Sequence, residues 1–221
     1  MRKINYTYHF TVEGETEKWY FEWLQRAINS TADILNTTKF NCHIQRDPLK
    51  RAKQLTTLDK VEITHIMDRE SEDKIHTDQF ITVLDRMKSA ERIGKSIEYR
   101  LGYSNFAFEL WIVLHKVDCN GPLNNRYQYL QPINKAFSEQ FENLDQYKSE
   151  DNFKRVLSKL TMNDVVQAVL RSKLIMHANQ ENGYTLHEYK RFHYYKENPS
   201  LSIWEIVEKI LIECGVFLSS S

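Results

Sequence analysis

Cysteine is scarce in this sequence of 221 residues: it has three, Cys42, Cys119 and Cys214, far apart and without paired spacing. This argues against a disulfide framework and a zinc site, and it fits a reducing cytoplasm. Long apolar runs are missing as well. The longest, residues 106–114, is far below membrane-spanning length, and the first ten residues lack the apolar run of a signal peptide. We therefore expect a soluble cytoplasmic protein that does not enter a membrane.

An excess of charge of either sign is also absent, because 30 Lys and Arg balance 30 Asp and Glu. The composition therefore gives no global electrostatic case for nucleic-acid binding, and any such surface must be a local patch. No G-x-x-x-x-G-K-[ST] loop occurs, so the chain lacks this ATP-binding motif. Hydrophobic residues at 41% can fill a core, and the length suits one domain with an appended subdomain.

Short β-rich runs alternate with helical patterns through the first half of the chain. We expect strands at residues 6–12, 40–45, 61–67 and 96–101, and helices after Gly14, at about residues 48–59, and from Thr77 or Asp78 to Gly94. This alternation is typical of an α/β fold with a mostly parallel sheet flanked by helices. Ligands of such a sheet bind at the carboxyl ends of its strands.

Helical spacing dominates from Asn124 onward. We therefore divide the chain into a sheet domain at residues 1–122 and a C-terminal helical extension at residues 123–221. The last helix is expected after Pro199, with Ser200 or Ser202 as its cap.

Two carboxylates stand at the end of the first expected strand. Glu13 closes the strand, Gly14 lets the backbone turn, and Glu17 falls in the first turn of the next helix. A favourable position near a helix N-terminus explains Glu17 without any ligand. It leaves Glu13 unexplained.

An acidic pair, Asp68 and Glu70, follows the third expected strand. Residues two apart point to the same side if the extended backbone continues through Arg69. Such a pair can hold one hard cation, although acidic loops after strands are commonly just solvated. A sparse set of oxygen ligands is what Mg²⁺ prefers.

Glu109 is the only charged residue in the apolar run 106–114, which is apolar all round and should be buried. An ionised carboxylate there is costly unless a cation or several donors compensate it. A metal ion would do so. Alternatively, Glu109 caps backbone amides in the first turn of its helix.

These motifs form one longer pattern: Glu13-Gly14-Glu15-Thr16-Glu17 with Tyr20-Phe21, Asp68-x-Glu70, Ser104-Asn105-x-x-Phe108-Glu109-Leu110-Trp111 with Leu114-His115, and Asn198-Pro199-Ser200. The pattern resembles the RloB family, whose members carry a Toprim domain related to that of OLD-type nucleases. It spans nearly the whole chain.

The resemblance implies a Toprim-like sheet domain and a Mg²⁺- or Mn²⁺-dependent nuclease that cleaves DNA or RNA. Glu13, Asp68, Glu70 and Glu109 would be catalytic, and the metal ligands would be these four with Glu17. The family implies anti-phage or abortive-infection defence beside an ABC-type ATPase partner, and a homo-oligomer is possible. The alternative is a non-catalytic subunit that binds a metal or nucleotide and regulates the ATPase.

This sequence departs from the family pattern at three places. Glu70 replaces the commoner aspartate and lengthens the reach of the carboxylate by one methylene. Phe106 and Ala107 stand where proline and cysteine are usual, and Lys116 stands where an aromatic residue often follows the histidine. The first departure concerns chemistry, and the others concern packing.

A basic, aromatic stretch at residues 187–196 can track a nucleic-acid backbone and stack bases; its candidate contacts are Lys190, Arg191, His193, Tyr194 and Lys196. The alternative is an amphipathic surface segment. His115 could orient a phosphate or serve as a core histidine. The sequence does not choose among Lys50, Arg51, Lys53 and Lys116 as the cation that neutralises a scissile phosphate.

Overall fold

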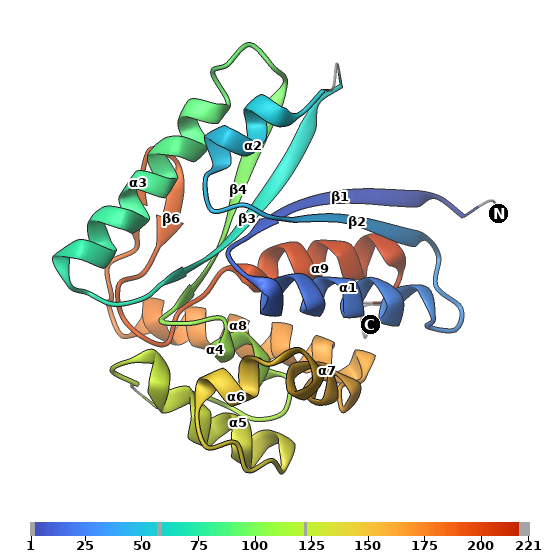
Figure 1. Ribbon diagram of the computed structural model, residues 1–221, viewed down its shortest axis with the longest axis vertical. Coiled ribbons are helices and arrows are strands. Elements are labelled where there is room, and N and C mark those ends of the chain that lie inside the picture. The colour runs from blue at the N-terminus through green and yellow to red at the C-terminus, as the bar shows by residue number, and fades with distance from the viewer. Residues whose placement is uncertain (1–2, 57–58, 122, 217–221) are drawn as a thin grey trace.

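A computed structural model describes residues 3–56, 59–121 and 123–216 of the chain. Its centre is a four-stranded, all-parallel sheet in the order β2-β1-β3-β4 (Figure 1). The strands are β1 (Asn5–Val12), β2 (Thr37–Ile44), β3 (Val61–Arg69) and β4 (Ile97–Asn105). The α/β class with helices flanking a parallel sheet is thereby confirmed.

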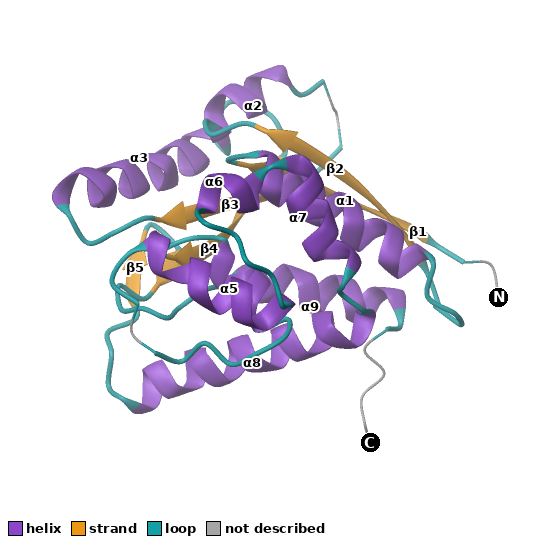
Figure 2. Cartoon of the chain, turned by 60° about the horizontal axis from the view of Figure 1, so that its bottom comes forward, coloured by secondary structure: helices purple, strands orange, loops and turns teal. Residues whose placement is uncertain are grey.

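Helices connect the strands and make up most of the second half of the chain. They are α1 (Glu15–Asn29), α2 (Pro48–Gln54), α3 (Lys74–Ala90), α4 (Glu109–Leu114), α5 (Leu130–Phe137), α6 (Leu144–Lys148), α7 (Glu150–Ser158), α8 (Met162–Glu181) and α9 (Ile203–Cys214), with a 3₁₀ turn at Arg126–Tyr129. Figure 1 shows α5 to α8 in the lower half of the molecule, away from α2 near the top, and Figure 2 shows α8 beside α9.

Two hydrophobic clusters cover the two faces of the sheet. One joins β1 to α1, α4 and α9, and it continues into the extension through residues such as Tyr147, Phe153 and Val169. The other packs α2 and α3 against β3 and β4. The segments on either side of residue 122 therefore share one hydrophobic core, and the division of the chain at that residue stays a prediction.

The helix boundaries differ from expectation in places with a local cause. α3 starts at Lys74 because the Asp73 side chain accepts a hydrogen bond from the backbone N–H of His76, and it ends at Ala90, before Gly94. The 106–114 run is helical only from Glu109 onward. Asp68 and Arg69 belong to β3 itself.

The extension also contains strands, which its helical spacing did not predict. β5 (His187–Tyr189) and β6 (Phe192–Tyr194) form an antiparallel hairpin. Ser202 is the N-cap residue of α9, as expected, but its hydroxyl donates to the Leu101 carbonyl of β4 instead of capping the helix. Within the described part of the chain, no helix is long and apolar enough to cross a membrane.

Candidate functional site

The first two carboxylates meet where β1 and β3 end. Glu13 directly follows β1, and its Oε2 accepts a hydrogen bond from the Asp68 backbone N–H at 3.3 Å. Asp68 is the penultimate residue of β3, and its Oδ1 accepts from the Ser104 hydroxyl of β4 at 3.0 Å. The parallel sheet thus brings Glu13 and Asp68 to one edge, although 55 positions separate them.

Glu17 lies buried in the first turn of α1, with 7% of its surface exposed. The Thr16 hydroxyl donates to its Oε2 at 3.1 Å. Gly14 precedes the helix with an extended backbone, so a positive φ does not explain the glycine there. A Cβ at this position would lie 3.1 Å from Glu17 Oε2, so glycine leaves room for the carboxylate.

Glu109 is the most deeply buried acid of the group, with 1% of its surface exposed. Its Oε1 lies 2.9 Å from the Lys148 ammonium, and its Oε2 is buried without a hydrogen-bond partner in the part of the chain that the structure describes. The N-cap position of α4 is Phe108, with no side-chain cap. Glu109 is therefore not a helix cap, and that interpretation was wrong.

Lys148 is a residue that the sequence did not single out. It is the last residue of α6, in the extension, and its ammonium reaches Glu109 across the interface with the sheet. Tyr147 beside it is fully buried, and its hydroxyl likewise has no partner among the described residues. No local pattern marks this pair, because its position depends on how the extension folds back.

The pKa values of the acids record crowding of negative charge. Burial raises the pKa of Glu13 to about 7; the hydrogen bond from Asp68 opposes this shift, and the charge of Glu17 adds to it. Burial, followed by the charges of Glu13, Glu17 and Glu109, raises the pKa of Asp68 well above its usual range. Burial and the charge of Glu109 also raise the pKa of Glu17, while Lys148 lowers it. The charges of Lys148 and Arg46 lower these pKa values but do not offset the effect of burial and of the neighbouring carboxylates.

Glu70 lies at the rim of this cluster, beyond the end of β3. Its side chain is 41% exposed, 3.4 Å from His76 Nε2 and 3.7 Å from the Arg126 guanidinium. Between Asp68 and Glu70, Arg69 is buried and donates to the Lys196 carbonyl at 2.7 Å. Asp68 therefore lies deeper in the cluster, and Glu70 extends it toward solvent.

The donor set has the chemistry of a hard-cation site. All four inner side chains offer carboxylate oxygens, which Mg²⁺ and Mn²⁺ prefer, and Glu109 Oε2 is an unsatisfied acceptor. As they stand, no three acidic, histidine or cysteine side chains among the described residues are spaced closely enough to hold a metal ion. The residues thus have the oxygen ligands that such an ion prefers, but not, as placed, the spacing of a formed metal site.

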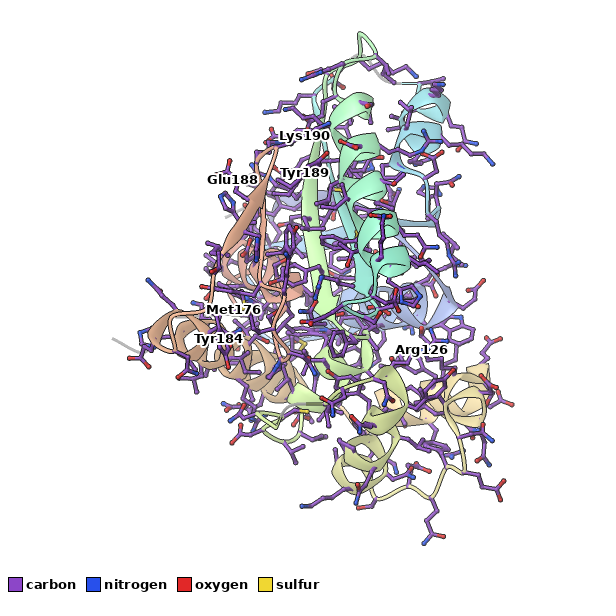
Figure 3. All side chains as sticks on the ribbon, turned by 90° about the vertical axis from the view of Figure 1, so that its left-hand side faces the viewer. Arg126, Met176, Tyr184, Glu188, Tyr189 and Lys190 are labelled. Atoms are coloured by element: carbon purple, nitrogen blue, oxygen red, sulfur yellow. The ribbon has the colours of Figure 1, made fainter. Side chains whose placement is uncertain are left out.

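The basic residues of the hairpin are bound to nearby acids and to the core. Lys190 pairs with Asp85, and the Arg191 guanidinium pairs with Glu91 and Glu98. Tyr194 is buried against Phe80 and Tyr103, so its ring is not open for base stacking. Figure 3 shows Lys190 at the tip of the hairpin, well away from Arg126 at the rim of the acidic cluster.

The remaining candidates fall into structural roles or stay predictions. His193 is exposed and Lys196 is half-buried, and their contact with nucleic acid stays a prediction. His115 is buried, with hydrogen bonds to the Tyr20 hydroxyl at 3.1 Å and the Trp111 carbonyl at 2.8 Å, so it is a core histidine. Lys116 pairs with Asp164 at the start of α8.

Comparison with known proteins supplies a family. Neither curated proteins nor solved structures gave a match. The model of the family described as RloB-like protein matches residues 8–210, a range that runs from β1 to α9 and includes all five acids. The chain therefore belongs to the RloB-like family.

Proposed function

We propose that this protein is a Mg²⁺- or Mn²⁺-dependent nuclease of the Toprim type, which cleaves phosphodiester bonds of DNA or RNA. The observation that carries the proposal is the acidic cluster at the strand ends: Glu13, Glu17, Asp68 and Glu109, with Lys148 as the one ammonium paired to it among the described residues. Burying like charges together is costly, and bound cations are the usual compensation.

The acidic residues would have different roles according to how deeply each is buried. Glu13, Asp68 and Glu109 would hold the cation, with Glu17 beside them and Glu70 at the solvent side, next to the incoming phosphate. Bound there, the cation would polarise the scissile phosphate and lower the pKa of a bound water. Ser104 and the Asp68 backbone N–H orient two of the carboxylates by hydrogen bonds.

Family membership supports a biological setting for this activity. We propose that the protein acts in anti-phage defence with an ABC-type ATPase, since the sequence has no P-loop of its own. The second candidate is a non-catalytic subunit that binds metal or nucleotide and regulates the ATPase. Tyr147 is buried beside the acids, its hydroxyl has no hydrogen-bond partner within the described ranges, and it would be part of either site.

The test is cleavage of supercoiled plasmid and of total tRNA with Mg²⁺ or Mn²⁺, by the wild type and by Glu13→Gln and Asp68→Asn. We expect each substitution to lower the cleavage rate by about 100-fold or more, because each removes a ligand charge. Glu15→Gln, an exposed acid of the same helix turn as Glu17, is the matched control and should keep full activity.

Two results would contradict the nuclease. Activity that survives both substitutions would remove the acidic cluster from the reaction. Calorimetric binding of Mn²⁺ without cleavage of either substrate, alone or with the ATPase present, would favour the regulatory subunit.

A further inference from the structure

A groove opens beside the acidic cluster, between the turn that leads into α2 and the outer side of α3. Its volume is about 740 Å³, and Arg46, Asp47 and Lys50 line one wall while Gln79, Thr82 and Arg86 line the other. The helices α2 and α3 themselves lie side by side (Figure 1). We call it the α2–α3 groove.

The groove starts at the edge of the sheet that carries the acids. The Gln45 backbone N–H donates to the Val12 carbonyl at 3.0 Å, which continues the β1–β2 pairing to the last residue before Glu13. The Arg46 Nε then donates to the Glu13 carbonyl at 3.3 Å. A chain lying in the groove would therefore arrive next to Glu13.

Positive charge in the groove is free to bind an anion. Arg46 and Lys50 are exposed and form no ion pair with any described residue. Arg86 lies 2.8 Å from Asp47, whose other oxygen accepts from the Leu49 and Lys50 backbone amides. The second acid of the lining, Asp78, lies 2.5 Å from the Lys74 ammonium, so both acids are already paired within the protein.

The lining also limits what can be recognised. Polar and aliphatic side chains line it, and none of its described lining residues is aromatic, so it has no platform for stacking bases. Guanidinium and ammonium groups bind phosphate oxygens irrespective of base sequence. The chemistry suits a sugar–phosphate backbone.

We infer that the α2–α3 groove binds the phosphate backbone of the nucleic acid and leads it to the acidic cluster, with Arg46 and Lys50 as its main contacts. This inference rests on the proposed nuclease function for its substrate class. It assigns the binding surface to α2 and α3 and not to the hairpin at residues 187–194.

The experiment measures binding apart from cleavage. Fluorescence anisotropy follows a labelled mixed-sequence oligonucleotide, as duplex DNA and as single-stranded RNA, with the Asp68→Asn protein in EDTA. In this background, Arg46→Glu with Lys50→Glu should weaken binding by about tenfold or more. The slope of log affinity against log salt concentration should also become shallower, by the amount that corresponds to about two lost phosphate contacts. The DNA and RNA arms show which backbone binds more tightly.

Two charge reversals elsewhere serve as comparison. Lys135 is exposed on α5, and α5 lies at the opposite end of the molecule from α2 (Figure 1). Lys135→Glu should therefore leave the affinity within about twofold of the Asp68→Asn protein. Lys190→Glu tests the hairpin. Thermal unfolding of every variant checks that the exposed substitutions leave the fold intact.

The outcomes separate the groove from the chemistry. An affinity as high in the groove double variant as in Lys135→Glu, or a loss seen only with Lys190→Glu, would overturn the inference even if the wild type cleaves. If the double variant loses binding and the wild type cleaves nothing with any metal, the groove is supported as a binding surface and the proposed nuclease activity is contradicted.

Discussion

The strand-end acids and the hairpin at residues 187–194 are both rich in charge, yet they handle it in opposite ways. In the hairpin, Lys190 lies against Asp85, and His193 lies 3.6 Å from Glu188. At the strand ends, Glu13 and Asp68 are crowded together, and burial with like charges raises both pKa values. Lys190, Arg191 and His193 of the hairpin each have an acidic partner, whereas the acidic cluster holds more carboxylates than ammonium groups among the described residues.

The difference separates charge that is paired within the protein from charge that is not. Sequence composition marked both regions, because it counts charged residues and not their partners. Paired groups at a surface contribute about 0–1 kcal/mol each, so the pairs of Lys190 with Asp85 of α3 and of Arg191 with Glu98 of β4 stabilise the hairpin only modestly. Buried acids without enough countercharge cost stability, which a bound cation would return.

The largest expected effect is a pH dependence of stability without metal. Because the pKa of Glu13 is raised to about 7 in the folded protein, the folded state binds a proton more tightly than the unfolded one. Its contribution to stability is therefore full below about pH 4.5 and is lost as the pH rises to about 7, by about 3 kcal/mol at most.

Urea unfolding in EDTA at pH 5.5 and pH 8 measures this loss. Glu13→Gln should reduce the fall in stability between the two pH values without abolishing it, because the pKa values of Asp68 and Glu17 are raised as well. Glu15→Gln should follow the wild type, and Mn²⁺ at pH 8 should restore stability to the wild type. A wild-type protein equally stable at both pH values would show that the negative charge of the acidic cluster is already compensated within the protein. The acidic cluster and the hairpin would then not differ in this respect.

Much of this contrast was accessible from the sequence, for physical reasons. Strand runs ending in acids predicted Glu13 and Asp68 at one edge, because parallel strands end together. The lone charge in an apolar run predicted the burial of Glu109. These inferences depend on local periodicity, which the sequence contains.

The partners of those acids were not accessible. Lys148 comes from a different helix, and only the tertiary packing of α6 brings it to Glu109. The hairpin was missed because two three-residue strands joined by a tight turn at Lys190, where φ is 57°, leave no periodic signal. The burial of Tyr194 and the pairing of Arg191 likewise depend on contacts with α3 and β4.

A smaller effect is expected from Lys148→Met. The change leaves Glu109 buried without its countercharge, and breaking a buried pair costs about 3–5 kcal/mol. The Lys148 side chain is 36% exposed, so solvent screening reduces this to about 2 kcal/mol. Denaturant unfolding in EDTA measures it. Lys154→Met, which breaks an exposed pair with Glu150 on α7, is the control and should cost under about 0.5 kcal/mol. Equal losses in the two variants would place Lys148 among ordinary surface pairs.

The smallest expected effect belongs to Arg191→Met, which probes the hairpin side of the comparison. Arg191 pairs with Glu91 and Glu98, and all three side chains are partly exposed to solvent; its guanidinium also donates to the carbonyl of the buried Tyr99 at 2.7 Å. We expect a loss of about 1 kcal/mol, seen as a melting temperature lower by about 2–4 °C. Oligonucleotide affinity and cleavage should not change, since the guanidinium is already bound within the protein. A variant with unchanged melting temperature but weaker oligonucleotide binding would show that Arg191 releases its acidic partners for phosphate, and the hairpin would then join the α2–α3 groove as a binding surface.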